Sequence, residues 1–81
     1  MKLTFKKLKD NAIIPSRATA ASAGLDISAC LDESVTLEPG DIKMIPVGIT
    51  AEPDCDDVAL LIYPRSCLST KFGVTIANCV G

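Results

Sequence analysis

The chain has 81 residues, of which 48% are hydrophobic and 22% charged, and its formal net charge is −2. A chain of this length forms one small domain, and such a domain buries only about 60% of the surface of its unfolded chain. The negative net charge excludes the basic surface on which binding to a nucleic-acid backbone depends, so no nucleic-acid partner is expected.

Apolar and polar residues alternate through short segments, which is the pattern of β-strands. The expected strands, in chain order, are Leu3–Lys7, Leu25–Ala29, Ser34–Leu37, Asp41–Ile45, Gly48–Ala51, Val58–Tyr63 and Val74–Ile76. Turn residues separate them at Pro39-Gly40, Pro46-Val47-Gly48 and Glu52-Pro53-Asp54. This spacing predicts an all-β sandwich or barrel, with one short helical turn after Arg65.

The hydrophobic content indicates whether the chain needs partners to cover its surface and whether it enters a membrane. A mean hydropathy of +0.35 is high for a small soluble domain and predicts surface covered by further strands or by other subunits. No segment approaches the roughly 18 apolar residues of a transmembrane helix, and the N-terminal residues lack the hydrophobic region of a secretory signal. We therefore expect a cytoplasmic protein with no membrane partner.

The segment Tyr63–Gly73 concentrates phosphate-binding chemistry where a strand is expected to end, at Pro64. Arg65 offers a planar fork of donors that matches phosphate oxygens, and Ser66 adds a hydroxyl. The backbone amides that follow would face an anion if a helical turn begins here, and Lys71 adds a second cation. Such turns also occur in proteins without a ligand, so this segment alone leaves both interpretations open.

A second segment, Ala23–Ala29, places one carboxylate, Asp26, among neutral residues with strand-like alternation. Taken alone, Asp26 is equally typical of a turn or a helix cap. Together, the sequences A-G-L-D-I-S-A and P-R-S-C-L-S-T-K-F-G, in this order and at this separation, resemble the first two motifs of the trimeric dUTP diphosphatases (dUTPases).

The resemblance covers essentially the whole chain. The connecting segments look like those of the family at Ile14-Pro15, Leu37–Gly40, Ile45–Ile49 and Gly73–Asn78. One departure is Cys67, where the family often has Gly, although only the backbone amide of that position usually faces phosphate. The other is the third motif, approximately G-x-I-D-x-D-Y-x-G, of which Gly81 looks like the first residue. The general base and the aromatic side chain over the deoxyribose are therefore expected beyond Gly81.

The resemblance implies a dUTPase-like jelly roll, a distorted β-barrel, of which residues 1–81 would be the N-terminal portion of a single domain, incomplete in this chain. It implies hydrolysis of dUTP to dUMP and pyrophosphate, with Mg²⁺ on the phosphate chain, in a homotrimer whose sites are each built from three subunits. Arg65, Ser66 and Cys67 would bind the phosphates, and Asp26 would hold Mg²⁺ through water. Asn78 and Gly81 would line the base pocket. Without the general base, the isolated chain is expected to be inactive.

Two alternatives stay open at this point. One is a non-catalytic nucleotide-binding or interaction module of the same fold. The other is an enzyme similar to dCTP deaminase, which shares the fold, although the order P-R-S-C-L-S-T-K disfavours it. The chain contains no histidine, which excludes Ser and Cys nucleophiles activated by His.

Other metal and disulfide sites are not expected. Cys30, Cys55, Cys67 and Cys79 form no C-x-x-C pair, so a structural zinc site is not predicted. In the absence of an export signal, the four cysteines are interpreted as reduced, buried thiols. The run of acidic residues at Asp54, Asp56 and Asp57 lacks the spacing and the glycine of a calcium loop, and it is interpreted as a solvated hairpin tip.

Overall fold

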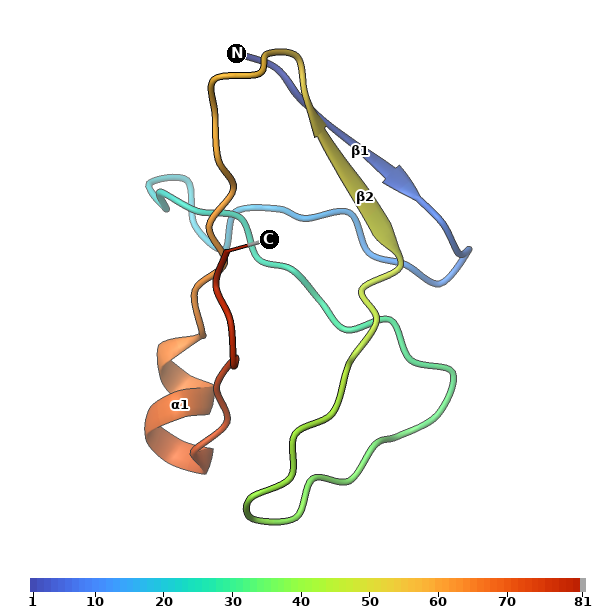
Figure 1. Cartoon of the computed structure of the whole chain (residues 1–81), viewed down its shortest axis with the longest axis vertical. Helices are drawn as coiled ribbons and strands as arrows, with labels where there is room; N and C mark the ends of the chain where they lie inside the picture. Colours follow the sequence, from blue (N-terminus) through green and yellow to red (C-terminus); the bar gives the residue numbers. More distant parts are fainter. Residues whose placement is uncertain (81) are drawn as a thin grey trace.

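The computed structural model describes residues 1–80. Its regular elements are the strands β1 (Leu3–Lys7) and β2 (Ile49–Pro53) and the helix α1 (Ser66–Phe72). The two strands occupy the upper half of Figure 1 and α1 the lower half, and the remaining chain runs between them in extended or turning segments. Within these residues no helix is long and apolar enough to cross a membrane.

β1 and β2 form a two-stranded antiparallel sheet. The register pairs Leu3 with Pro53, Thr4 with Glu52, Phe5 with Ala51, Lys6 with Thr50 and Lys7 with Ile49. Because side chains alternate between the faces of a sheet, Leu3 and Phe5 share one face and are half-buried, whereas Lys6 on the other face is exposed. Pro53 ends the ladder, since its nitrogen has no hydrogen to donate.

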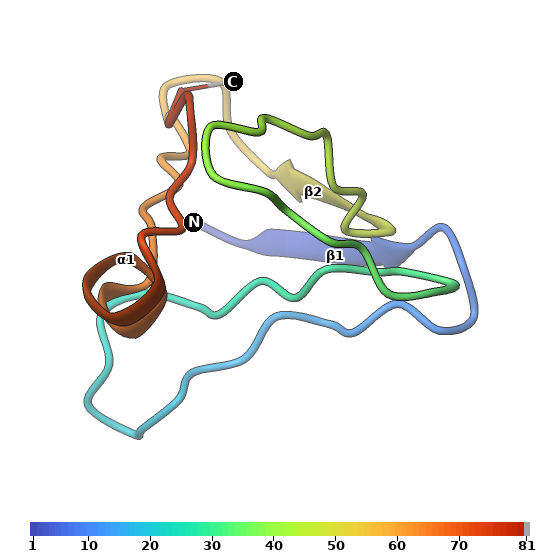
Figure 2. The same ribbon diagram turned by 90° about the horizontal axis from the view of Figure 1, so that it is seen from below.

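Two isolated bridges join further segments without forming strands. Ser16 pairs with Asp26, whose N–H donates to the Ser16 carbonyl at 2.8 Å. Leu61 pairs with Val80. The C-terminal segment accordingly runs beside the segment that precedes α1 in both ribbon views (Figure 1 and Figure 2). These bridges hold segments that are distant in the sequence next to one another.

Only part of the expected β-structure forms. The strand at Leu3–Lys7 is confirmed, and the one expected at Gly48–Ala51 is β2, which begins one residue later and ends at Pro53. The helical turn expected after Arg65 is α1. The other expected strands were wrong within residues 1–80: Leu25–Ala29, Ser34–Leu37, Asp41–Ile45, Val58–Tyr63 and Val74–Ile76. A strand needs a partner segment along its length to pair its backbone groups, and these segments have single bridges at most.

The buried core is small and is centred on Ala12, Pro15 and Cys30. Ala12 and Cys30 pack against Gly48, whose φ of +65° is a left-handed conformation that glycine adopts without strain. A Cβ atom at Gly48 would lie 2.8 Å from the Cys30 sulfur and 3.0 Å from the Ala12 Cβ. Gly48 is therefore required both by its backbone angle and by the space that its neighbours leave.

The chain exposes more surface than a closed domain of its mass. Its accessible surface is 6818 Å², whereas a compact monomer of 8.5 kDa has about 4,700 Å². Its radius of gyration is 14.0 Å, against about 12 Å for a compact chain of this length. Large apolar side chains contribute to this surface. Leu61 is 51% exposed and Ile62 is 47% exposed. Roughly 2,100 Å² is thus in excess, which is the scale of a large and stable interface.

The four thiols, all unpaired, differ in exposure. Cys30 is buried and Cys55 is half-buried, while Cys67 and Cys79 are exposed. The expectation of buried thiols was therefore wrong for Cys67 and Cys79, because α1 and the C-terminal segment carry them on the surface. Burial, with a smaller contribution from a hydrogen bond to Asp57, raises the pKa of the Cys55 thiol.

The close packing around Gly48 predicts that adding one methyl group there makes Cys30 more accessible to solvent. We expect Gly48→Ala to accelerate alkylation of Cys30 by iodoacetamide roughly 5- to 150-fold, the equivalent of the 1–3 kcal/mol that overpacking typically costs. Mass spectrometry of the modified peptide measures the rate, with the exposed Cys67 as internal reference. Gly40→Ala is the matched control, since Gly40 also has a positive φ but has open space around its Cβ position. Equal rates in the two variants would contradict this account of the core.

The excess surface predicts the behaviour of the chain in solution. We expect the isolated 81-residue chain to self-associate or to be partly disordered, because exposed apolar side chains and unpaired strand edges favour association. Analytical ultracentrifugation over a range of concentrations, combined with circular dichroism melting, measures both. A compact monomer with a sharp cooperative melt would contradict the prediction.

Candidate functional site

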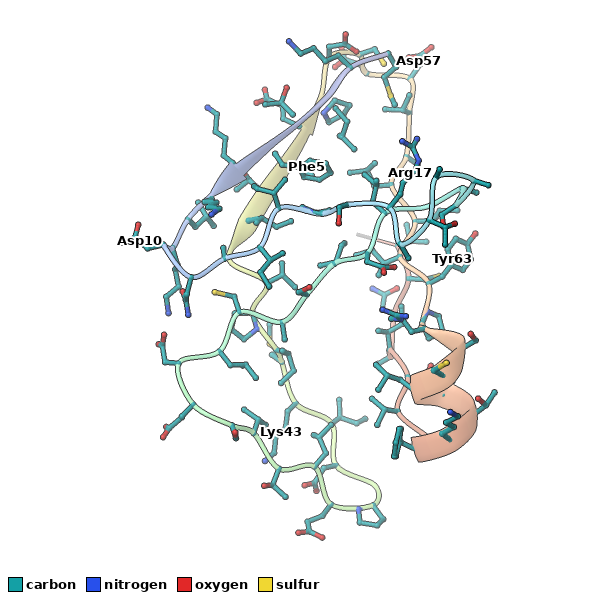
Figure 3. All side chains as sticks on the ribbon, turned by 180° about the vertical axis from the view of Figure 1, so that it is seen from behind. Phe5, Asp10, Arg17, Lys43, Asp57 and Tyr63 are labelled. Atoms are coloured by element: carbon teal, nitrogen blue, oxygen red, sulfur yellow. The ribbon has the colours of Figure 1, made fainter. Side chains whose placement is uncertain are left out.

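The two segments singled out in the sequence face one open hollow of about 720 Å³. Its polar lining includes Asp26, Arg65, Ser66 and Asn78. Much of its apolar wall comes from Leu25, Ile27, Val47, Leu61, Ile62 and Ile76. Tyr63 also lines the hollow. It precedes α1 in the sequence and lies above the helix in Figure 3. The hollow therefore combines a cation, a hydroxyl, a carboxylate and an amide with an apolar wall.

The chain places Arg65 at the point where extended backbone becomes helix. Its backbone is extended, with φ −77° and ψ 133°, and its carbonyl accepts the N–H of Ser69 at 3.0 Å as the first helical hydrogen bond. The first N–H groups of a helix have no acceptor within it. The amides of Ser66 and Cys67 are in this position, and no side chain caps the helix. Donors from the backbone and from Arg65 thus occur together at the start of α1.

Arg65 forms an ion pair with Asp26 across 39 residues of sequence. The guanidinium Nη1 donates to the carboxylate Oδ2 at 3.2 Å. The two side chains are 60% and 42% exposed, and ion pairs with such access to water contribute about 0–1 kcal/mol. Asp26 is also fixed through its backbone by the bridge to Ser16. The pair therefore orients both side chains and is weak enough to be exchanged for a ligand.

Asn78 reaches the hollow because the chain reverses at the end of α1. Gly73 ends the helix in the left-handed conformation, with φ +66°, and its N–H donates to the carbonyl of Ser69 at 3.1 Å. The returning segment then pairs with the chain ahead of the helix, where the N–H of Ile62 donates to the carbonyl of Cys79 at 3.0 Å. This pairing holds Asn78 at the hollow.

The remaining residues proposed from the sequence lie elsewhere. The side chain of Cys67 is exposed and does not line the hollow, so only its backbone amide can take part. Lys71, expected as a second cation, is in the last turn of α1 and does not line the hollow either. Gly81 is outside the described residues. Among residues 1–80, Arg65 is the one cation that lines the hollow.

The ion pair between Asp26 and Arg65 was not predicted from the sequence. The two residues were expected to bind different ligands and were not expected to contact each other. Their opposite charges, in two segments assigned to the same site, could have indicated the ion pair. The distance between them depends on the bridges at Ser16 and Leu61, which no local pattern predicts.

The donor set fits one kind of metal ion. Within residues 1–80 no group of three or more His, Cys, Asp or Glu residues could hold a metal, and Asp26 is the one carboxylate that lines the hollow. Mg²⁺ keeps several waters and is usually bound by one or two carboxylates together with substrate phosphates. A single, half-exposed carboxylate beside a guanidinium fits a hydrated Mg²⁺ better than a metal held by protein ligands alone.

Two groups of charged residues outside the hollow, Lys9 with Asp32 and the acidic turn Asp54–Asp57, have partners of their own. Lys9 donates to Asp32 at 2.9 Å, and this contact raises the pKa of Lys9 and lowers that of Asp32. In the acidic turn, the Asp54 carboxylate accepts the N–H of Lys2 at 2.9 Å. Figure 3 shows Asp57 at the end of the molecule away from α1. Neither group of charges contributes to the hollow.

Comparison with known proteins places this geometry in context. The dUTPase family profile matches residues 10–80. The chain is 42% identical over 81 residues to a protein of Burkholderia multivorans (strain ATCC 17616 / 249) named deoxyuridine 5'-triphosphate nucleotidohydrolase. It is 41% identical to proteins of the same name from Paraburkholderia phytofirmans and Hahella chejuensis. Each match covers 100% of this chain and 53% of the relative, so the chain spans about half the length of the curated relatives it matches.

Proposed function

Because this chain belongs to the dUTPase family, we propose that its hollow is the phosphate- and metal-binding wall of a site that hydrolyses dUTP to dUMP and pyrophosphate. The observation that carries the proposal is the convergence of Arg65, Ser66 and Asp26 on one hollow from two distant segments. Positioning and charge neutralisation are most of what phosphoryl chemistry requires of a protein. The names of the three relatives support dUTP rather than dCTP as the nucleotide.

The phosphates would be held at the start of α1. Arg65 presents a planar fork of N–H donors that matches phosphate oxygens, and its exposure leaves it accessible. The Ser66 hydroxyl and the backbone amide of Cys67 would add shorter-range donors. Donors that are already in place stabilise the charge that develops during hydrolysis without reorganisation, which makes this the main catalytic contribution of the wall.

Asp26 would hold Mg²⁺ through water. The ion, when bound, neutralises phosphate charge and orients the phosphate chain for attack by water. The carboxylate is beside the phosphate-binding arginine, and its hard oxygens suit a hydrated Mg²⁺. Its fixed backbone, bonded to Ser16, would keep the carboxylate in place while the nucleotide enters.

Residues 1–81 would supply only part of the remaining site. Asn78 and Gly81 would line the base pocket, and the general base would follow in the third motif. We propose that residues 1–81 form the N-terminal portion of one dUTPase-like jelly roll within a homotrimer. The excess exposed surface supports this, since further strands and neighbouring subunits would cover it.

The position proposed for the general base, beyond Gly81, predicts the activity of residues 1–81 on their own. We expect the purified 81-residue polypeptide to hydrolyse dUTP no faster than buffer containing Mg²⁺, because loss of a general base alone costs about 10²–10⁴-fold. A coupled assay for pyrophosphate release measures the rate. Robust release by the 81-residue polypeptide would show that the roles assigned here are incomplete.

The residue roles can be tested in this chain extended by the C-terminal half of a family relative. We expect Arg65→Ala to lower turnover about 10²–10³-fold, by analogy with removal of one preorganised donor. Asp26→Asn should instead weaken the dependence of turnover on Mg²⁺, because it removes charge near the ion and preserves shape. Steady-state kinetics over a range of Mg²⁺ concentrations separate the two effects.

The matched control for these variants is Asp56→Asn, next to Asp57, which Figure 3 shows at the end of the molecule away from α1. It changes the net charge as Asp26→Asn does but does not touch the hollow. We expect both turnover and Mg²⁺ dependence to stay near those of the unmodified protein. Damage as large as that caused by Arg65→Ala would contradict the proposed position of the site.

A further inference from the structure

The two groups proposed to bind opposite charges are bound to each other in this structure. Arg65 Nη1 donates to Asp26 Oδ2 at 3.2 Å, and both residues line the hollow. The Asp26 carboxylate engages one of the five N–H donors of the guanidinium, and that donor cannot serve a phosphate at the same time. A phosphate that reaches Arg65 also meets the negative charge of Asp26. Asp26 therefore competes with phosphate for Arg65.

We propose that Asp26 couples cation binding to phosphate binding by occupying Arg65 until a divalent cation takes up its charge. Arg65 is then released and turns to the nucleotide phosphates. This inference rests on the proposed function and extends it to the linkage between the two ligands. Linkage is reciprocal, so the cation raises the affinity for the nucleotide by the same factor as the nucleotide raises the affinity for the cation.

For Arg65 to move from Asp26 to a phosphate, Asp26 must stay in place while the Arg65 side chain turns. Asp26 is held by its backbone N–H, which donates to the Ser16 carbonyl at 2.8 Å, so its carboxylate stays at the hollow. Arg65 has a long side chain that is 60% exposed, and the Asp26 carboxylate is its one side-chain hydrogen-bond partner within residues 1–80. The guanidinium can therefore swing from the carboxylate to a phosphate while the backbone stays fixed.

The test measures binding rather than turnover. The probe is a dUTP analogue with an imido bridge between the α and β phosphorus atoms. It is titrated calorimetrically, with either EDTA or MgCl₂, into this chain extended by the C-terminal half of a family relative. Without Mg²⁺ we expect Asp26→Asn to bind the analogue about 3- to 10-fold more tightly than the unmodified chain, because the competing carboxylate is gone. Mg²⁺ should raise the affinity of the unmodified chain but leave that of Asp26→Asn nearly unchanged.

Asp32→Asn is the matched control for general electrostatics. It removes the same charge and breaks the ion pair with Lys9, but neither residue lines the hollow. The inference predicts that this variant binds the analogue as the unmodified chain does and keeps the effect of Mg²⁺. An equal gain in Asp26→Asn and Asp32→Asn would show that net charge alone is responsible and would overturn the inference.

Arg65→Ala separates failure of the inference from failure of the proposed function. If Arg65→Ala weakens binding without Mg²⁺ while Asp26→Asn gives no gain, Arg65 binds phosphate but Asp26 does not compete, and only the inference fails. If Arg65→Ala leaves binding unchanged with Mg²⁺ present as well, the phosphate site itself is misplaced and both fail. Circular dichroism and the Cys30 alkylation rate check the fold of each variant, and Asp26→Ser carries the same expectation should Asp26→Asn fail to fold.

Discussion

An extended segment forms a strand only where a second segment pairs with its backbone, and the few pairings in this chain position its candidate site. The ladder between β1 and β2 forms the longest of them. The bridge from Ser16 carries Asp26 to the hollow, and the bridge between Leu61 and Val80 places the chain ahead of Arg65 beside the returning C-terminal segment. The buried core adds little, so the site depends on backbone pairing more than on packing.

The chemistry of the hollow follows from this arrangement. Two segments supply one cation and one carboxylate, which neutralise each other at 3.2 Å while both remain open to water. A buried pair of this kind would resist exchange, because separating buried charges is costly, whereas an exposed pair can be replaced by stronger partners. A nucleotide with its metal ion offers both partners at once. The exposed surface of the chain and the proposed function of the hollow are therefore consistent with each other.

Local pattern was enough to predict some elements and not others. The alternation in Leu3–Lys7 predicts β1 with its observed bounds, and Pro64 followed by Arg65 and Ser66 predicts where α1 begins. The segments Ser34–Leu37 and Asp41–Ile45 show the same alternation but form no strand, because pairing requires a neighbour that local sequence does not reveal. The lining residues could be assigned through family motifs, whereas the Asp26–Arg65 contact depends on bridges between distant segments.

The central claim is that nucleotide phosphates bind at the start of α1, beside Asp26. The most direct test is nuclear magnetic resonance of the ¹⁵N-labelled chain, titrated with Mg²⁺ and the imido analogue of dUTP. The account predicts the largest shifts in the amides of Asp26, Ser66 and Cys67 and in the side-chain Nε–H of Arg65, with little change from Asp54 to Asp57. Largest shifts in the lysine-rich segment Lys2–Lys9 or in the acidic turn would contradict it.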